Sequence, residues 1–120
     1  MIEVTPPLPQ LLALAIQAIM RALPTATGHM RAQHLGVYAA ILALHDAGQP
    51  PSTSAIAELL GMAPTHVSRI TRVLVETGLV SRSIVHASHG RGHLNVYYPV
   101  YRLSEIVAAN PKASSANKRP

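Results

Sequence analysis

The chain of 120 residues has the length of one domain, which is long enough to bury a hydrophobic core. Ten lysines and arginines against five acidic residues give a formal charge of +5, and such a surface attracts polyanions, above all nucleic acid. The absence of cysteine excludes disulfides, thiolate metal sites and cysteine nucleophiles, and it fits a reducing compartment, so we expect the protein in the cytoplasm. Because only 12% of the residues are charged, charge alone leaves open a protein that is merely basic.

Residues 1–27 form the first predicted unit, an apolar helix from Pro9 to about Leu23. Its apolar residues lie on nearly every side, so the helix must be covered on all sides. A second copy of the chain or the rest of its own domain can supply that cover, and we assign dimerisation to this unit. The segment does not resemble a signal peptide, because Glu3 and no basic residue precedes it. It also reaches Arg21 and Pro24 before the ~20 apolar residues that a membrane span requires.

Three further helices are predicted before residue 78. Apolar residues at helical spacing, followed by glycine and two prolines, predict a helix over residues 30–47. Ser52 or Thr53 can cap a short helix over residues 55–60, which ends at a glycine. The proline at position 64 suits the first turn of a fourth helix over residues 64–77, because its missing N–H would have no partner there.

After Gly78 the pattern changes from the period of a helix to that of half-buried strands. In the two expected strands Val80, Arg82 and Ile84 alternate with Ser81, Ser83 and Val85, and Leu94, Val96 and Tyr98 alternate with Asn95 and Tyr97. The stretch HASHGRGH between them, with two glycines, predicts a hairpin tip. A short helix over residues 103–109 and a disordered, basic tail over residues 110–120 are expected to follow.

The stretch from Ala57 to Ile70 has the spacing of two helices that cross closely. The small residue Ala57 lies four positions before Gly61. Val67 and Ile70 lie six and nine positions after Gly61. This spacing is typical of a helix-turn-helix unit, in which the two aliphatic residues hold the second helix on the first. The opposite face of the helix over residues 64–77 then presents hydrogen-bond donors that suit a major groove. These are Thr65, Ser68, Arg69 and Arg72, with His66 beside them.

Residues 35–100 resemble the winged-helix core of the MarR family, through VSRITRVL in the fourth helix and GLVSR at the entry to the wing. The resemblance implies a mainly α (α+β) fold, a winged helix-turn-helix over residues 28–109 with a two-stranded β-wing and an extra N-terminal helix. It further implies a sequence-specific transcriptional regulator that binds double-stranded DNA, usually as a homodimer on a pseudo-palindrome. The helix over residues 64–77 would enter the major groove, and the wing over residues 81–99 would lie on the adjacent minor groove.

The resemblance also assigns roles to single residues. The positions that match DNA-facing residues of a recognition helix are Thr65, Ser68, Arg69 and Arg72. Arg69 is the candidate for guanine, because a guanidinium group can donate two hydrogen bonds to O6 and N7. Arg72 and Arg82 are candidates for phosphate, and Arg91 matches the wing-tip arginine that enters a minor groove. A solvated or structurally paired side chain is the alternative at each position.

The sequence departs from the MarR pattern after the wing. MarR proteins continue into long helices that pair two subunits and often hold a ligand cleft, whereas only residues 99–120 follow the wing here. Any dimer must therefore depend mostly on the N-terminal helix, with the short stretch around Leu103 and Ile106 as a second candidate contact, and a small-molecule effector stays an open question.

Other functions find less support in the sequence. His86, His89 and His93 suggest a metal site in the wing, but no acidic residue or cysteine lies nearby to complete it. We therefore expect no metal and no cofactor. No pair of acidic residues has the spacing for general acid–base catalysis, and no nucleophile elbow or phosphate loop is present, so we expect no enzyme. The remaining alternative is a winged-helix protein-interaction module without DNA binding, which would meet an acidic partner.

Overall fold

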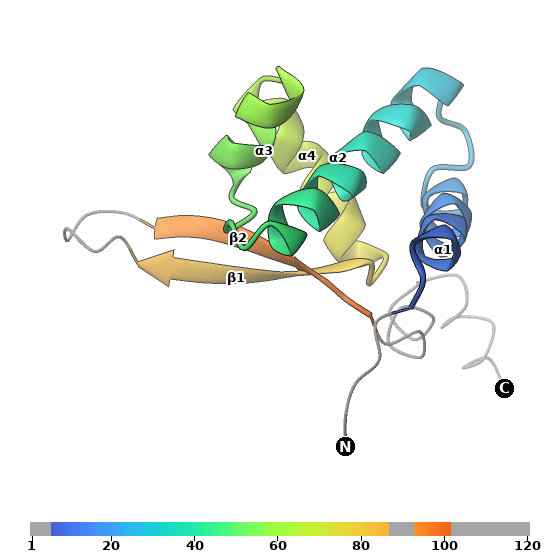
Figure 1. Ribbon diagram of the computed structural model, residues 1–120. Helices are drawn as coiled ribbons and strands as arrows, with labels where there is room; N and C mark the ends of the chain where they lie inside the picture. Colours follow the sequence, from blue (N-terminus) through green and yellow to red (C-terminus); the bar gives the residue numbers. More distant parts are fainter. Residues whose placement is uncertain (1–5, 87–92, 102–120) are drawn as a thin grey trace, which may run out of the picture.

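The computed structural model describes residues 6–86 and 93–101, which form four helices followed by a two-stranded antiparallel sheet (Figure 1). The elements are α1 (Leu8–Ala22), α2 (Gly28–Asp46), α3 (Thr53–Leu60), α4 (Pro64–Glu76), β1 (Val80–His86) and β2 (His93–Pro99). This arrangement confirms the mainly helical winged helix-turn-helix fold. The expected helix over residues 103–109 and the tail over residues 110–120 lie outside the described residues.

Side-chain caps decide where the helices begin. The Thr27 hydroxyl accepts a hydrogen bond from the Met30 amide at 3.1 Å, so α2 starts two residues earlier than its apolar pattern predicts. Ser52 caps α3 in the same way, by accepting from the Ala55 amide at 3.1 Å, and Thr53 is already helical. Of the two caps that the sequence left open, the structure therefore uses Ser52.

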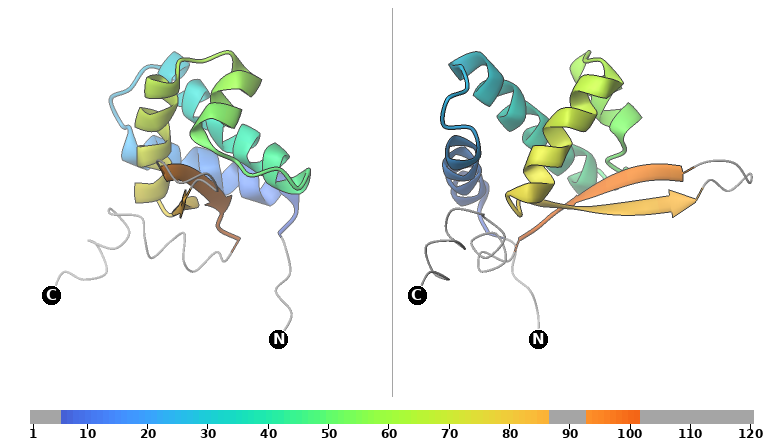
Figure 2. Two further views of the ribbon diagram at one scale, coloured as in Figure 1. Left: turned by 90° about the vertical axis from the view of Figure 1, so that its left-hand side faces the viewer. Right: turned by 180° about the vertical axis from the view of Figure 1, so that it is seen from behind.

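The core is built around α2, which contacts α1, α3, α4 and β2. Figure 2 shows α1 on one side of α2 and the pair of α3 and α4 on the other. Val37, Tyr38 and Ile41, on the inner side of α2, are fully buried. The hydrophobic core therefore joins the N-terminal helix and the helix-turn-helix into one packed body.

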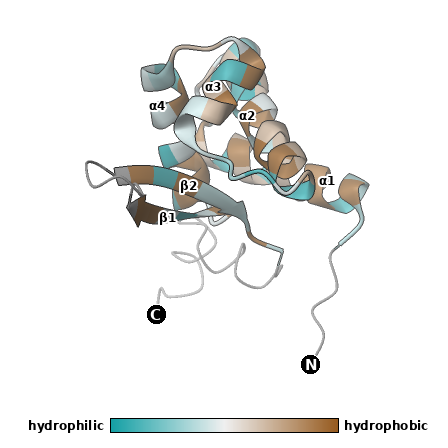
Figure 3. Cartoon of the chain, turned by 60° about the vertical axis from the view of Figure 1, so that its left-hand side comes forward, coloured by the Kyte–Doolittle hydropathy of each residue, from teal (hydrophilic) through white to brown (hydrophobic). Residues whose placement is uncertain are grey.

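Only one side of α1 is covered by the chain itself. Leu11, Ala15, Ala18 and Ile19 are buried, whereas Leu8, Ile16 and Met20 are 56%, 44% and 49% exposed. Figure 3 shows this apolar character along α1. The sequence left open whether the rest of the domain or a second copy covers this helix. The rest of the domain covers one side of α1, and an apolar strip on its other side remains exposed.

The connection between α1 and α2 is held by Arg31. Its guanidinium group donates to the Leu23 carbonyl through Nε at 3.1 Å and through Nη2 at 3.0 Å, and Nη2 also donates to the Pro24 carbonyl at 2.8 Å. These carbonyls follow the end of α1, where no helical partner is available for them. One side chain of α2 therefore holds the C-terminal end of α1 in place.

The register of the wing places Val80, Arg82 and Ile84 opposite Pro99, Tyr97 and Asn95. Residues that are directly opposite share a face, so Tyr97 lies on the face of Arg82 and Tyr98 on the other face. Burial does not follow the expected alternation, because Tyr97 is 3% exposed and Tyr98 is 37% exposed. The outer residues Ile84, Val85 and Leu94 are exposed, since the wing extends beyond the helices that cover its base.

A backbone contact outside the two strands, which the sequence pattern did not reveal, supports the base of the wing. Ser52 forms an isolated antiparallel bridge with Val96, and the Tyr97 amide donates to the Pro51 carbonyl at 3.0 Å. Val96 is buried, and it lies between Ser83 of β1 and the bridging residue Ser52.

No helix within the described residues combines the length with the apolar character that crossing a membrane requires.

Two glycines provide a matched test of the turn between α3 and α4. Gly61 has φ 66° and a left-handed conformation, so Gly61→Ala should lower the free energy of unfolding by about 1 kcal/mol. Gly36 lies inside α2 with open space around a new Cβ, so Gly36→Ala should raise the free energy of unfolding by about 1 kcal/mol. Urea denaturation of the two variants checks the opposite signs. A stabilised Gly61→Ala variant would contradict the assigned turn geometry.

Tyr38 provides a second test, at alkaline pH. Its hydroxyl is buried without a hydrogen-bond partner in the described part of the chain. Burial, assisted by the nearby Tyr101, raises the pKa of Tyr38 from 10.0 to about 12. The unfolded chain therefore ionises at this residue before the folded chain does, and stability falls as the pH rises from about 10 towards 12.

Tyr38→Phe removes both the ionisable group and the unsatisfied hydroxyl. We expect it to raise the free energy of unfolding at neutral pH by about 1 kcal/mol. The loss of stability between about pH 8 and about pH 11 should also become smaller, as guanidinium denaturation at both values measures. The exposed Tyr98 supplies the control Tyr98→Phe. Equal alkaline losses in the wild-type protein and Tyr38→Phe would refute this assignment.

Candidate nucleic-acid interface

The residues that hold α4 against the rest of the domain are all buried. Ala57 on α3 is 6% exposed, and Val67, Ile70 and Leu74 on α4 are 0%, 2% and 0% exposed. Gly61 ends α3, and the Met62 amide donates back to the Ala57 carbonyl at 3.0 Å, which closes the last turn of the helix. The predicted helix-turn-helix packing is confirmed, and it leaves the opposite face of α4 uncovered.

The exposed face of α4 consists of the residues that the sequence assigned to it. Thr65, Ser68, Arg69 and Arg72 are all exposed. Steps of three and four residues place them along one face of the helix. The inward positions between them are taken by the core residues and by Thr71, whose buried hydroxyl donates to the Ser68 carbonyl at 3.0 Å. The side chains available to a partner of α4 are therefore mainly donors, two of them cationic.

His66 lies at the edge of this face rather than on it. Its side chain is half-buried, and Nε2 lies 3.2 Å from Oε1 of Gln33 on α2. This contact joins α4 to α2 near the start of α4. The sequence showed no sign of the Gln33 partner, because the two residues lie 33 positions apart. The structure therefore gives His66 a structural contact, and its predicted role towards DNA remains a prediction.

A hollow of about 500 Å³ lies between α4 and the wing. Arg72 from α4 and Arg82 from β1 both line it, although they are ten positions apart in the sequence. The remaining lining residues are Ser68, Thr71, Val75, Glu76, Asn95 and Tyr97. Two guanidinium groups and one carboxylate leave this hollow with a net positive charge, which favours an anionic group.

The N-terminus of α4 adds a further positive end. The residue before the helix is Ala63, which has no side chain that could cap it, and the first turn contains no acidic residue. The partial positive charge of the helix dipole is therefore not offset by a neighbouring carboxylate in the first turn. An uncompensated helix N-terminus favours a phosphate group.

Part of the predicted site lies where the structure gives no description. Arg91 and His89 belong to residues 87–92, and nothing is described for the side chains of His86 and His93. Within the described residues there is no group of three His, Cys, Asp or Glu side chains that could hold a metal ion. The predicted wing-tip contact of Arg91 and the histidine hypothesis thus stay untested.

Comparison with known protein families found a match for the segment that contains α3 and α4. Residues 39–83 match the IclR helix-turn-helix domain. The matched range runs from the middle of α2 through α3 and α4 into β1, so it contains the packed unit and the exposed face of α4. This segment is therefore similar to an IclR-type helix-turn-helix DNA-binding domain, and the similarity supports a role in transcription regulation.

The match corrects the family expected from the sequence. A winged helix-turn-helix regulator is supported, and residues 39–83 match the IclR helix-turn-helix rather than the MarR family expected from the sequence. The MarR resemblance depended on VSRITRVL and GLVSR, which extend a helix-turn-helix signature formed by Ala57, Gly61, Val67 and Ile70. These positions serve the close crossing of two helices, a requirement of the helix-turn-helix unit in general, so they do not discriminate between families.

Two further comparisons add little. The crystal structure of RV1404 from Mycobacterium tuberculosis has 20% sequence identity to this chain and a TM-score of 0.44, over 91% of this chain and 67% of that one. Similarity at this level carries no conclusion about function. No curated protein matches the chain.

Proposed function

We propose that this protein is a transcriptional regulator that binds a specific sequence of duplex DNA, with α4 in the major groove and the wing on the adjacent minor groove. The observation that carries the proposal is the division of α4 into two faces. Its apolar face is buried by α2 and α3, while Thr65, Ser68, Arg69 and Arg72 are exposed together. The IclR-type helix-turn-helix match covers this same helix.

Arg69 is the residue to which we assign base recognition. It is exposed on α4 and does not line the hollow towards the wing, so its side chain is available to extend into a groove. A guanidinium group that donates to both O6 and N7 of guanine typically contributes about 1 to 3 kcal/mol of discrimination. Thr65 and Ser68, beside it on the same face, can contact bases or phosphates through their hydroxyl groups.

Arg72 and Arg82 are assigned to the phosphate backbone. They line one hollow between α4 and the wing, so one stretch of backbone could be held between the helix and β1. Contacts of this kind position a protein on the duplex without reading its sequence. The unprotected N-terminus of α4 would support a second phosphate contact. Arg91 is proposed for the minor groove, and its contact depends on residues outside the described part of the chain.

We further propose that two copies pair through α1. Leu8, Ile16 and Met20 leave an apolar strip of this helix exposed, and a symmetric pair would cover it with the same strip of a second copy. A twofold dimer would present two α4 helices, which suits a pseudo-palindromic target. The exposed strip supports the sequence-based prediction that residues 1–27 mediate dimerisation.

A protein-interaction module is the second candidate, and one observation favours it. Ile84, Val85 and Leu94 are 56%, 41% and 42% exposed at the outer part of the wing, where a phosphate contact would need polar or cationic side chains. A surface of this kind suits another protein. The arginines on α4 favour DNA, because an interaction module has no need to expose two cations on the outer side of the helix-turn-helix.

The first experiment measures DNA binding at several salt concentrations, on a target selected from a random duplex pool. Affinity falls as salt rises, and Arg72→Ala should reduce the steepness of log affinity against log salt by about 1, because one phosphate contact is lost. Arg69→Ala should weaken binding to the selected target by about 1 to 3 kcal/mol and reduce discrimination at one base pair. Gel retardation titrations provide both quantities.

Arg21→Ala is the matched control, since Arg21 is an exposed arginine on α1 and not on the exposed face of α4. It should leave discrimination unchanged. If the wild-type protein bound no duplex at low salt, the DNA-binding proposal would be overturned and the interaction module would be favoured. Equal effects of Arg21→Ala and Arg69→Ala on discrimination would remove the assigned role of Arg69.

The second experiment tests the pairing through α1. Ile16→Glu combined with Met20→Glu places two carboxylates on exposed positions, so the fold should persist while an apolar interface should not. We expect sedimentation to change from a dimer to a monomer. Gln17→Glu adds the same kind of charge at an exposed position of α1 and serves as the control. A double variant that stays dimeric would place the interface elsewhere.

A further inference from the structure

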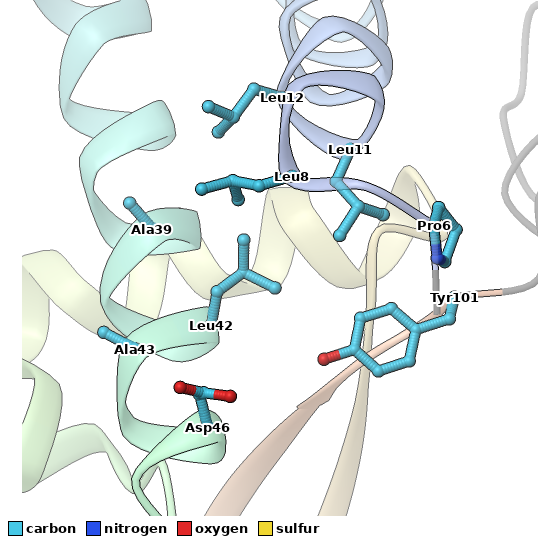
Figure 4. A pocket seen from close by; sticks show the side chains of 9 residues that line it. All are labelled: Pro6, Leu8, Leu11, Leu12, Ala39, Leu42, Ala43, Asp46 and Tyr101. Carbon is cyan, nitrogen blue, oxygen red and sulfur yellow. The ribbon is translucent and has the colours of Figure 1, made fainter. Parts of the chain in front are cut away.

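A second hollow, away from α4, lies between the beginning of α1 and the end of α2. Its volume is about 450 Å³, and Tyr101 closes it on the side of the wing (Figure 4). Concave sites for small organic molecules have volumes of about 300 to 1,000 Å³. The space arises from unequal side chains on the two helices, because leucines of α1 face Ala39 and Ala43 of α2.

The walls of this hollow are apolar except at one end. Leu8 and Leu12 from α1 and Leu42 from α2 provide aliphatic surface. In Figure 4 the Asp46 carboxylate and the Tyr101 hydroxyl lie on opposite sides of the same end of the hollow, away from Leu12. An apolar body with one polar end is the shape of molecule that such a lining fits.

The polar end is negative. Asp46 is the last residue of α2 and the one charged residue in the described lining of the hollow. The carbonyl groups at the end of α2 add the negative end of a helix dipole to its carboxylate. Burial raises the pKa of Tyr101, and the charge of Asp46 raises it further, so the field of this carboxylate reaches the tyrosine hydroxyl. The Tyr101 ring can also face a cation.

We propose that this hollow binds a small organic cation, an apolar molecule with a protonated amine that pairs with Asp46. The charge distribution distinguishes it from the smaller hollow of about 190 Å³ at the other end of the α1–α2 pair, which Arg31 lines. That smaller hollow borders Ile16 and Met20, two of the three residues assigned to pairing of two copies. Leu8 belongs both to the cation site and to the strip of α1 assigned to pairing. The cation site does not need DNA binding, so the cation proposal and the DNA-binding proposal can fail independently of each other.

Three probes with one carbon skeleton and different charges test the site. They are 4-phenylbutylamine, 4-phenylbutan-1-ol and 4-phenylbutyrate, titrated at neutral pH into the full chain labelled with ¹⁵N. The amine should shift the amide signals of Ala39, Ala43 and Asp46. Its affinity should exceed that of the alcohol by about threefold, because Asp46 is exposed to solvent, and the butyrate should bind more weakly still.

Two variants assign the effect to named residues. Asp46→Asn should abolish the preference for the amine over the alcohol, while Glu58→Gln, which removes an exposed carboxylate from α3, should keep it. Ala43→Leu should weaken all three probes, because the longer side chain fills the hollow. Amide signals of α4 that stay unchanged in each variant would confirm that the fold persists.

Other outcomes overturn the proposal. Equal binding of the amine and the butyrate, or shifts confined to other parts of the chain, would remove the cation site. If no probe bound and Ala43→Leu converted a dimer into a monomer in sedimentation, a second copy of the chain would be the occupant instead. Loss of amine binding in Glu58→Gln but not in Asp46→Asn would also contradict it.

Discussion

The burial of one face of α4 against α2 and α3 is the constraint on which the rest of the molecule depends. Val67, Ile70 and Leu74 are inserted into a core that α2 provides, and this contact sets the orientation of the helix. Since the inward positions are filled by aliphatic side chains, rotation of α4 would expose them to water at a cost of about 1.5 to 3 kcal/mol for each. The outer face of α4 is therefore presented in a fixed direction by the contacts of its inner face.

The sequence predicted this unit well because its signals are local. A left-handed glycine, a capping serine and a proline in the first turn each act within a few residues, and the apolar period extends over one helix. The exposed positions of Thr65, Ser68, Arg69 and Arg72 followed from the same period. What local signals could not supply was the family, because the pattern at Ala57, Gly61, Val67 and Ile70 reflects helix packing that is not specific to one family.

The wing was predicted less completely, because its burial depends on distant parts of the chain. Alternation along β2 does not reveal that Ser52, 44 positions earlier, lies beside Val96. The same holds for the contact between His66 and Gln33, and for the shared hollow of Arg72 and Arg82. In each of these the decisive neighbour comes from another element, and a period within one element carries no information about it.

The hydrogen bonds of Arg31 to the end of α1 would restrict the geometry of any assembly formed through that helix. Because one guanidinium group holds the carbonyls of Leu23 and Pro24, α1 cannot swing freely about the link to α2. Two copies joined through α1 would then hold their α4 helices at a set separation. Such an assembly would select its targets by the distance between half-sites as well as by their bases, since only spacings near whole turns of the duplex place both helices in accessible grooves.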